Sequence, residues 1–489
     1  MEMPSDDICY RALSTRDARF DGRLFVGVTS TGIYCRPICP VRVPQRKNCR
    51  FFPSAAAAQG AGFRPCLRCR PEISPDAAAW RGTSNTVSRA LALIAEGALD
   101  GGESSVLLLA ERLGMGERQL RRLFDKHIGV PPVAVAQTRR VLFAKQLIQE
   151  TQLPMAAIAQ ASGFGSVRRF NDAFLKLYRR PPRELRVNKT GEPTAIVLRL
   201  GYKPPYDWDA ILGFLSQRAI EGVETVASGC YGRTVAVEGG VGTVEVRPGE
   251  RNCLVATIRI SEVRGLLSIV ARLRRLFDLD ADVEAIDAHL SEDRSLAPLV
   301  AQRPGLRSPG CWDAFELAVR AVLGQQITVS AARNLAGELA KLAGEKIAGG
   351  GGLTHIFPTP PQMMKADLSK LGMTRARIAC LEALAEAAAK DRKLLEPAGD
   401  YESAVARVLA LPGWGPWTAQ YWALRALRDA DAFPESDVGL LRSPTVASAN
   451  GRLSPKALLA RAERWRPWRA YAAQHLWTHD GETRSRAHA

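Results

Sequence analysis

Two kinds of hydrophobic pattern run along the chain. Apolar residues recur every three or four positions in "NTVSRALALIAEGAL", in "VLLLAERL" and almost throughout the chain beyond residue 281, and this spacing predicts helices. Apolar and polar residues alternate in "AIVLRL" and "TVAVEGGVGTVEVRPGERNCLVATIRI", which predicts strands joined by glycine turns. With the amphipathic segment "LLSIVARLRRLFDL", residues 195–280 are therefore expected to mix α and β structure. Residues 1–75 show neither pattern and are rich in arginine, proline and cysteine.

One helical segment is repeated. "LAERLGMGERQLRRLF" (109–124) is similar to "IAQASGFGSVRRFNDAF" (158–174). The corresponding glycines Gly114 and Gly163 lie 49 residues apart. A Pro-Pro pair follows each copy, and the two pairs lie 50 residues apart. Each copy therefore predicts a helix, a glycine turn, a second helix with a basic outer face, and a proline stop.

Length and charge narrow the class of protein. At 489 residues the chain is too long for a single core, so three or four domains are expected. No apolar run approaches the roughly 18 residues of a membrane span, and the N-terminus lacks a secretion signal, so we expect a cytoplasmic protein without membrane contact. The formal net charge is +17. Residues 1–190 hold 30 basic and 16 acidic residues (+14), and the remainder holds 37 and 34 (+3). This bias favours a polyanionic partner, although a generally arginine-rich composition would also produce it.

Four cysteines near the N-terminus have metal-ligand spacing. Cys35 and Cys39 form C-x3-C, and after a gap of 26 residues Cys66 and Cys69 form C-x2-C. In a reducing compartment this spacing favours tetrahedral zinc over disulfides, with buried structural cysteines as the alternative. Zinc would also supply folding energy to a region with little core of its own. Cys49 is expected to be a packing residue.

The sequence segments around these cysteines are similar to those of a known protein family. "RDARFDGRLFVGVTSTGIYCRPICP" and "RKNCRFFPSAAAAQGAGFRPCLRCRP" resemble the N-terminal domain of the Ada family of bacterial alkylation-response proteins, over about residues 7–75. The resemblance implies zinc held by Cys35, Cys39, Cys66 and Cys69, and irreversible methyl transfer from DNA methylphosphotriesters to Cys35. Methylation turns one thiolate into a neutral thioether, so repulsion from the DNA backbone should fall and binding should tighten.

The repeat resembles the AraC-type DNA-binding domain, which carries two helix-turn-helix units. The recognition helices would span about 116–127 and 165–177. A solvated helix face is the alternative for their polar residues, whereas Phe164, Phe170 and Phe174 are expected in the core. Arginine suits guanine edges and phosphates alike. The residues offered to DNA are Glu117, Arg118, Arg121, Arg122, Ser166, Arg168 and Arg169.

A glycine-rich turn and a later aspartate suggest a third site. In "LPGWGPWTA", Gly413 and Gly415 allow a sharp turn whose N–H groups face a phosphate, and Asp437 follows Trp417 by twenty residues. Without further context Asp437 could equally be a helix N-cap. The pairing resembles the helix-hairpin-helix DNA glycosylases.

Longer segments sharpen this resemblance. "YKPPYDWDAILGFLSQRAIEGVETV", "RPGLRSPGCWDAFELAVRAVLGQQITV", "FPTP" and "ERWRPWRAYAAQHLW" resemble the AlkA-type 3-methyladenine DNA glycosylases over about residues 195–480. The resemblance implies that Asp437 stabilises an oxocarbenium-like sugar while an alkylated base leaves. The hairpin position that holds a lysine nucleophile in bifunctional relatives is Trp417, so a monofunctional enzyme without a lyase step is expected.

The flipped base needs an aromatic pocket, where a cationic base gains cation–π energy. By motif match the candidates are Phe214, Trp417, Tyr421 and Trp477, although such residues are more often core. Two positions depart from the family pattern. Thr478 replaces a tyrosine, and Gln326, a predicted DNA contact, replaces a leucine thought to wedge into the gap left by the flipped base.

The predicted protein is multidomain and mainly α with α+β parts. Residues 1–80 form a small four-cysteine zinc domain, 81–190 an AraC-type double helix-turn-helix, 191–285 an α+β subdomain, and 286–489 a helical helix-hairpin-helix glycosylase domain. One chain would accept methyl groups, activate repair genes with RNA polymerase as partner, and excise alkylated purines from double-stranded DNA of the nucleoid. Its DNA partners would be damaged sites and promoters.

Two other functions remain open on the residues alone. The chain could be a regulator whose inactive glycosylase part only contacts DNA, or an enzyme whose front half only tethers it there. No Pro-Cys-His-Arg string occurs, so repair of O6-methylguanine is not expected.

Overall fold

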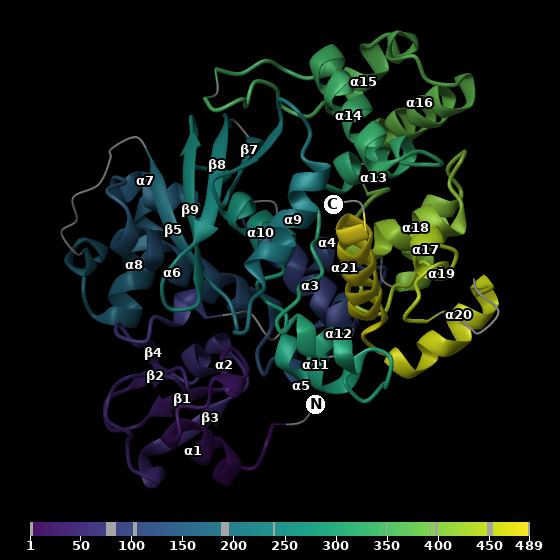
Figure 1. Cartoon of the computed structure of the whole chain (residues 1–489). Helices are drawn as coiled ribbons and strands as arrows, with labels where there is room; N and C mark the ends of the chain where they lie inside the picture. The colour runs from purple at the N-terminus through teal and green to yellow at the C-terminus, as the bar shows by residue number, and fades with distance from the viewer. Residues whose placement is uncertain are drawn as a thin grey trace. The chain divides into compact units, whose positions relative to one another are not determined.

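The computed structural model describes residues 3–74, 85–100, 105–186, 195–237, 240–348, 350–391, 393–396, 400–446 and 453–487. The chain divides into two compact units, each gathered from separate stretches of sequence (Figure 1). The first holds Met1–Lys203, Val235–Ala271 and Leu279–Ala281; the second holds Pro204–Thr234, Arg272–Asp278 and Asp282–Ala489. The predicted domain boundaries at residues 80 and 190 lie outside the described residues.

A four-stranded sheet carries the N-terminal part of the first unit. Its order is β3-β1-β2-β4, with β1 antiparallel to β2 and β3, and β2 parallel to β4. Successive side chains of β1 enter different clusters, because Phe25 packs with Tyr34 and Phe52 whereas Val26 packs with Leu24 and Cys49. Each cluster is small, as expected for a part that needs another source of stability. The elements are α1 (Asp6–Ser14), β1 (Phe25–Val28), β2 (Ile33–Cys35), β3 (Cys49–Phe52), α2 (Ala55–Gly60) and β4 (Arg64–Pro65).

The sequence repeat forms two helix pairs in the first unit. Gly114 and Gly163, at the turns, have φ angles of +69° and +77°, a region that strongly favours glycine. A Cβ at position 163 would also lie 2.7 Å from Cγ of Asp100. The pairs confirm the predicted repeat. The helices are α3 (Asn85–Ala95), α4 (Val106–Arg112), α5 (Glu117–His127), α6 (Pro132–Glu150), α7 (Met155–Ala161) and α8 (Val167–Tyr178).

A second sheet confirms the mixed α and β prediction for residues 195–280. Its strand order is β5-β9-β8-β7-β6, and β9 pairs antiparallel with both β5 and β8. The alternating pattern sends Leu198, Val246 and Ala256 to buried positions. The elements are β5 (Ile196–Gly201), α9 (Trp208–Arg218), β6 (Glu224–Ala227), β7 (Cys230–Val237), β8 (Gly240–Pro248), β9 (Cys253–Ile260) and α10 (Leu266–Leu276).

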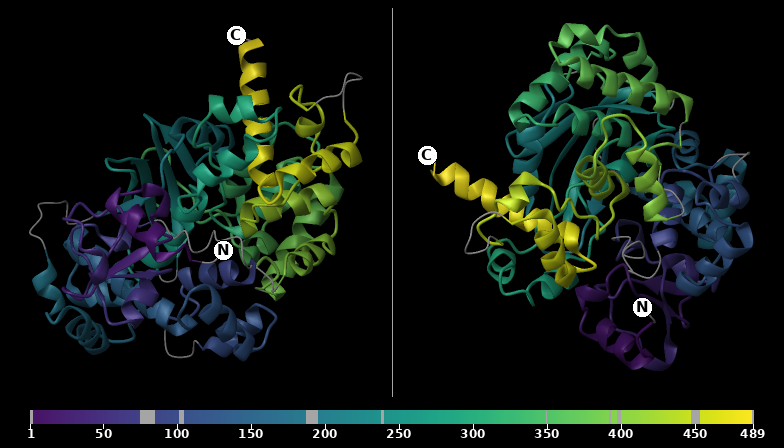
Figure 2. Two further views of the ribbon diagram at one scale, coloured as in Figure 1. Left: turned by 90° about the horizontal axis from the view of Figure 1, so that it is seen from below. Right: turned by 90° about the vertical axis from the view of Figure 1, so that its right-hand side faces the viewer.

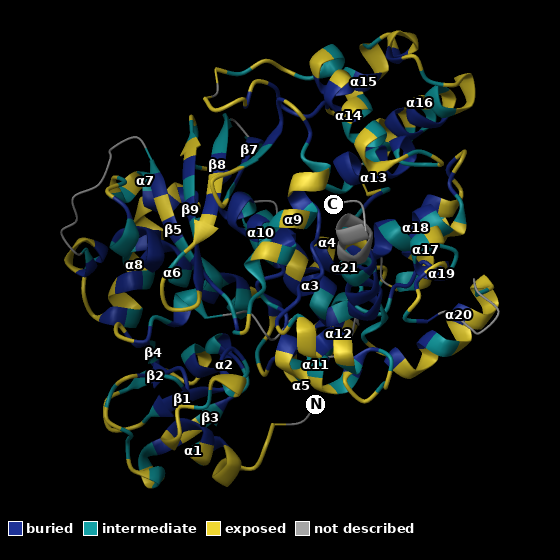
Figure 3. Cartoon of the chain, viewed as in Figure 1, coloured by how far each residue is buried: buried dark blue, intermediate teal, exposed yellow. Residues whose placement is uncertain are grey.

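The rest of the second unit is helical, as the sequence pattern predicts, and Figure 2 shows this green-to-yellow region from two further sides. A core of this unit joins α13, α16 and α18 through buried residues such as Leu323, Leu381 and Trp422. Figure 3 colours the buried stretches of these helices dark blue. Directly after α18 the chain makes a π-helical stretch, Ala423–Leu427. The helices are α11 (Val283–Leu290), α12 (Ala297–Gln302), α13 (Ala314–Leu323), α14 (Val329–Ala343), α15 (Pro360–Lys365), α16 (Arg375–Lys390), α17 (Tyr401–Leu409), α18 (Pro416–Trp422), α19 (Val438–Leu441), α20 (Pro455–Ala462) and α21 (Arg469–Ala487).

The helices of the described residues are too short or too polar to span a membrane.

Candidate metal centre, nucleic-acid interface and base pocket

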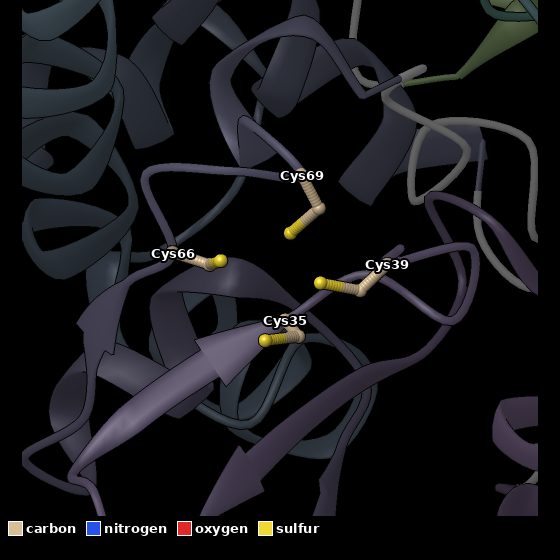
Figure 4. Close-up of side chains that lie close together, drawn as sticks. All are labelled: Cys35, Cys39, Cys66 and Cys69. Atoms are coloured by element: carbon tan, nitrogen blue, oxygen red, sulfur yellow. The ribbon is translucent and has the colours of Figure 1, made fainter. Parts of the chain in front are cut away.

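The four cysteines of the predicted zinc site lie together (Figure 4). Strand pairing explains why: β2 and β4 run parallel with Tyr34 opposite Pro65, so the next residues, Cys35 and Cys66, end up side by side. Cys39 and Cys69 follow in the turns after the two strands. All four sulfur atoms lie within 4.8 Å of one another, and the residues are 3–7 % exposed.

This donor set suits Zn²⁺, which forms tetrahedral sites with four cysteine ligands and Zn–S bonds of about 2.3 Å. Hydrogen bonding to Cys39 raises the pKa of Cys35, and hydrogen bonding to Cys35 lowers the pKa of Cys66. Four sulfur atoms this close together form a ready site for a dication that replaces the thiol protons.

Backbone hydrogen bonds distinguish the sulfurs, whereas burial does not. The Arg36 N–H donates to Sγ of Cys69, and the Arg68 N–H donates to Sγ of Cys66, both at 3.4 Å. Sγ of Cys35 accepts no such bond from any described residue. Because an N–H···S bond withdraws electron density, Cys66 and Cys69 are weaker nucleophiles than a sulfur without one.

Two buried cationic side chains donate hydrogen bonds to backbone carbonyl groups of the cysteine cluster. Arg36 donates to the carbonyl oxygen of Cys69 at 3.1 Å and pairs with Asp21, with 2.7 Å between Nε and Oδ1. Lys145 of α6 is fully buried, donates to the carbonyl oxygen of Cys66 at 3.1 Å and pairs with Glu72 at 2.6 Å. The cysteine turns are therefore anchored to α6, the helix that connects the two helix-turn-helix units.

The second helix of each repeat, α5 and α8, carries the residues predicted to contact DNA. The buried faces hold Leu120 and Phe124 in α5, and Phe170 and Phe174 in α8, each 0 % exposed. Phe170 and Phe174 are thus core residues, as predicted, and Phe164 lies half-buried with its ring 5.5 Å from that of Phe170. The opposite faces expose Arg118, Arg121, Arg122, Ser166, Arg168 and Arg169.

Some of these exposed residues have local structural partners. Arg121 pairs with Glu117 at 2.6 Å on the same helix, and Arg168 lies 4.0 Å from Asp172. Oγ of Ser166 accepts the N–H of Arg169 at 3.2 Å and so caps α8, which is why that helix begins two residues later than predicted. Arg118, Arg122 and Arg169 pair with no carboxylate among the described residues.

The predicted hairpin lies between α17 and α18. Gly413 has a φ of +75°, and a Cβ there would lie 2.8 Å from Sγ of Cys380, so only glycine fits. Gly415 is the N-cap of α18. Gln325, which sequence reasoning did not single out, donates to the carbonyl oxygen of Gly413 at 3.0 Å. Its neighbour Gln326, the predicted DNA contact, is exposed with a φ of +58° and lies on a turn tied to the hairpin through Gln325.

Asp437 is held by three N–H donors. The Trp417 indole donates to Oδ2 at 2.8 Å, and the Trp477 indole donates to Oδ1 at 2.9 Å. The backbone N–H of Leu440 also donates to Oδ1, at 3.0 Å, so Asp437 is the N-cap of α19. Both interpretations of the sequence are therefore compatible, because the residue caps a helix and presents an oriented, half-buried carboxylate beside aromatic rings.

The candidate base-pocket residues lie together beside that carboxylate. The rings of Trp417 and Tyr421 stack with centroids 5.4 Å apart and an interplanar angle of 9°. Tyr421 meets Trp477 edge-on at 6.4 Å. Phe214 of α9 joins them through a shared neighbour, Arg425, whose Cζ lies 4.6 Å from the Phe214 ring centroid.

Arg425 is the pocket residue that sequence reasoning missed. Its Cζ also lies 5.6 Å from the centroid of Tyr421 and 5.5 Å from that of Trp477. The only sequence signal is an arginine inside the apolar run "YWALRAL", four residues after Tyr421. Thr478, one of the two departures from the family pattern, accepts a hydrogen bond from Gln474 at 3.2 Å.

Comparisons with known proteins agree with this geometry. Residues 8–72 match the metal binding domain of Ada, 109–188 match a helix-turn-helix domain, and 197–313 match the AlkA N-terminal domain. A Mycobacterium tuberculosis protein named "Probable bifunctional transcriptional activator/DNA repair enzyme AlkA" is 42 % identical over 480 residues, covering 96 % of this chain and 95 % of its own length.

Two further relatives match the rear part alone. The DNA-3-methyladenine glycosylase 2 of Escherichia coli is 38 % identical over 290 residues, which cover 58 % of this chain and 97 % of that protein. The solved 3-methyladenine DNA glycosylase of Archaeoglobus fulgidus superimposes with a TM-score of 0.52 at 23 % identity, covering 58 % of this chain and 98 % of that one. At that identity the solved structure shows a shared fold.

Proposed function

The chain belongs to the family of bifunctional transcriptional activator/DNA repair enzymes, and we propose that it performs two chemical reactions on alkylated DNA at two separate sites. Cys35 accepts a methyl group from a DNA methylphosphotriester. Asp437 drives hydrolysis of the N-glycosidic bond of alkylated purines such as 3-methyladenine. The observation that carries the second reaction is the Asp437 carboxylate, held by two indole N–H groups beside stacked aromatic rings.

At the first site Cys35, Cys39, Cys66 and Cys69 hold zinc, which when bound keeps the sulfurs as thiolates at neutral pH. The Cys35 sulfur attacks the methyl carbon of the phosphotriester. The carbon–oxygen bond breaks, and its electron pair stays on the phosphate oxygen, which leaves an ordinary phosphodiester. Cys35 is a better nucleophile than Cys66 and Cys69, because its sulfur accepts no backbone N–H from a described residue, whereas theirs do.

The methylated site has one negative charge fewer, so repulsion of the DNA backbone falls. The arginine faces of α5 and α8 read promoter DNA in successive major-groove segments, and RNA polymerase is the partner in activation. Arg118, Arg122 and Arg169 are the best candidates for DNA contacts, since none is engaged by a carboxylate of the described residues. The protein acts in the cytoplasm, on DNA of the nucleoid.

At the second site the alkylated purine is flipped out of the duplex and placed against the aromatic rings. The bond from C1′ of the sugar to the base breaks, and the electron pair leaves with the base, which neutralises a cationic purine. The Asp437 carboxylate stabilises the positive charge left on the sugar, and water adds to C1′ and loses a proton. The Trp417 indole cannot form a Schiff base, so no strand cleavage follows.

Both activities are tested on the full-length zinc protein. After incubation with methylphosphotriester DNA, intact-mass analysis and peptide mapping should find one methyl group on Cys35, and none on the Cys35→Ser protein. The same preparation should release 3-methyladenine from alkylated DNA, and Asp437→Asn should not. A folded, zinc-bound protein that gains no methyl group would refute the first reaction, and one that releases no base would refute the second.

A further inference from the structure

Arg425 is a buried cation among the rings of the base pocket. It lies in the π-helical stretch after α18 and is 1 % exposed. Its guanidinium faces Phe214, Tyr421 and Trp477, from three different helices, at 4.6, 5.6 and 5.5 Å from their centroids. Helical bulges of this kind re-aim one side chain and recur at functional sites.

The guanidinium of Arg425 has only neutral acceptors among the described residues. Nη1 donates to the carbonyl oxygen of Pro309 at 2.8 Å, and Nη2 donates to Oε1 of Gln474 at 2.8 Å. Nε is buried and has no hydrogen-bond partner within the described ranges. Burial lowers the pKa of Arg425 to about 10, so the group still carries its proton at neutral pH.

An uncompensated buried charge is costly, and a core position would normally avoid it. Two other buried arginines of the same unit have carboxylates: Arg233 lies 2.7 Å from Glu316, and Arg428 pairs with Asp278. A second cation adds to the charge at the pocket, since Cζ of Arg218 lies 4.0 Å from the centroid of Phe214. The positive charge beside the pocket rings thus sets this site apart from those ion pairs.

We propose that Arg425 determines the substrate range of the glycosylase, because its charge favours bases that leave as anions over bases that are already cationic. The inference rests on the proposed base excision at this pocket. It assigns to Arg425 a selectivity role, whereas hydrolysis itself depends on Asp437.

Charge development explains the direction of the effect. A cationic N-alkylated purine keeps part of its charge until it has left, so a nearby cation opposes its entry into the pocket. A neutral damaged base such as hypoxanthine gains negative charge as it leaves, and a guanidinium in a low-dielectric pocket stabilises that charge. Arg425 also takes up cation–π attraction of the same rings that a cationic base would use.

Gln474 offers a conservative way to neutralise Arg425. In Gln474→Glu the side chain keeps its size, and the acceptor 2.8 Å from Nη2 becomes a carboxylate. The experiment measures the single-turnover rate at which each variant excises hypoxanthine and the rate at which it excises 7-methylguanine. Both bases are placed in the same DNA sequence, and the enzyme concentration is kept below saturation. We expect the hypoxanthine-to-7-methylguanine ratio to fall about tenfold, because a paired guanidinium no longer offers a net charge.

Two substitutions of Arg425 complete the set. Arg425→Met removes the charge and should lower the ratio by at least as much as Gln474→Glu. Arg425→Lys keeps the charge and should leave the ratio within about threefold of the wild-type value. Gln302→Glu, at the exposed end of α12, adds the same charge on the solvent-exposed surface and should leave the ratio unchanged.

Each result is informative. If Arg425→Met does not fold, Gln474→Glu alone decides, because it leaves both hydrogen bonds of Nη1 and Nη2 in place. If the two excision rates fall together in Gln474→Glu, or if the ratio stays constant, Arg425 is only a structural brace and the inference is wrong. If the wild-type protein excises neither of these bases nor 3-methyladenine, the proposed function has failed instead.

Discussion

The cysteine cluster and the Asp437 pocket hold their reactive groups in opposite ways. The four cysteines come from two short strands and the turns after them, beside two small apolar clusters. Asp437 stands at a helix N-terminus beside the core that joins α13, α16 and α18, and two indoles and one backbone N–H orient it. The first site therefore depends on zinc for its geometry, whereas the second is preorganised by the protein alone.

Charge compensation separates the two sites as well. Around the cysteines each buried cation has a carboxylate, Asp21 for Arg36 and Glu72 for Lys145. In the pocket Arg425 has none among the described residues. Paired cations brace a structure, and an unpaired one remains available to act on a ligand. Arg36 and Lys145, beside the cysteines, therefore stabilise the fold, whereas Arg425, in the pocket, serves selectivity.

Removal of zinc should produce the largest effect and should be confined to the first unit. Zinc contributes about 10 kcal/mol or more to the folding of small metal domains, so a chelator should expose residues 25–69 to hydrogen exchange. Eight of the nine tryptophans, Trp208 to Trp477, lie in the second unit, so tryptophan fluorescence reports mainly on the glycosylase part. The melting transition of the glycosylase part, followed by tryptophan fluorescence, should not change, and neither should base excision.

A matched pair of cysteine variants tests the same point without a chelator. Cys66→Ser should lose zinc, whereas Cys49→Ser, equally buried at 6 % but outside the cluster, should keep it. Loss of base excision along with zinc would contradict the independence of the two sites.

Asp437→Asn should abolish excision and spare methyl acceptance. We expect a loss of about 10³-fold in the single-turnover excision rate, because the charge that stabilises the sugar cation is gone. Asparagine caps helices about as well as aspartate, so α19 should be retained. Its amide nitrogen cannot accept the Trp417 indole N–H, so the free energy of unfolding should fall by about 1 to 3 kcal/mol. The substitution therefore separates the catalytic role from the capping role of Asp437. Full excision by the variant would show that only the cap matters.

Lys145→Met should destabilise the cysteine site through its scaffold. Glu72 would lose one partner in a buried environment, which should lower the free energy of unfolding of the first unit by about 3 kcal/mol. The measurement of this loss is zinc release, which should occur at a lower temperature or a lower denaturant concentration than in the wild type. Lys126→Met removes the same charge from the exposed face of α5 and should have little effect. Equal zinc release by both variants would show that the buried pair is not a brace.

Gly439→Ala should weaken the second site by a smaller amount. A Cβ at position 439 would lie 2.9 Å from Oδ1 of Asp437, so the carboxylate must shift. We expect excision to fall about 10- to 100-fold, since small misplacements of a catalytic group are costly. Gly481→Ala, whose Cβ meets nothing within 4 Å, is the control. An unchanged rate in Gly439→Ala would mean that the pocket is less preorganised than its hydrogen bonds indicate.

Local patterns in the sequence were sufficient for much of this protein. Cysteine spacing predicted a zinc site, the 50-residue repeat predicted two helix-turn-helix units, and "LPGWGPW" predicted the hairpin. These features depend on turn chemistry and helical periodicity, which neighbouring residues determine. The roles of the individual site residues came from family resemblance and stay predictions.

Tertiary structure alone decided how distant segments meet. Parallel pairing of β2 with β4 places Cys35 beside Cys66, and the fold brings the indoles of Trp417 and Trp477, 60 residues apart in sequence, onto one carboxylate. Arg425 pairs with no carboxylate of the described residues, and the sequence around it does not predict this either. The physical reason is that burial and pairing depend on packing across the whole core, whereas sequence patterns record only what neighbouring residues prefer.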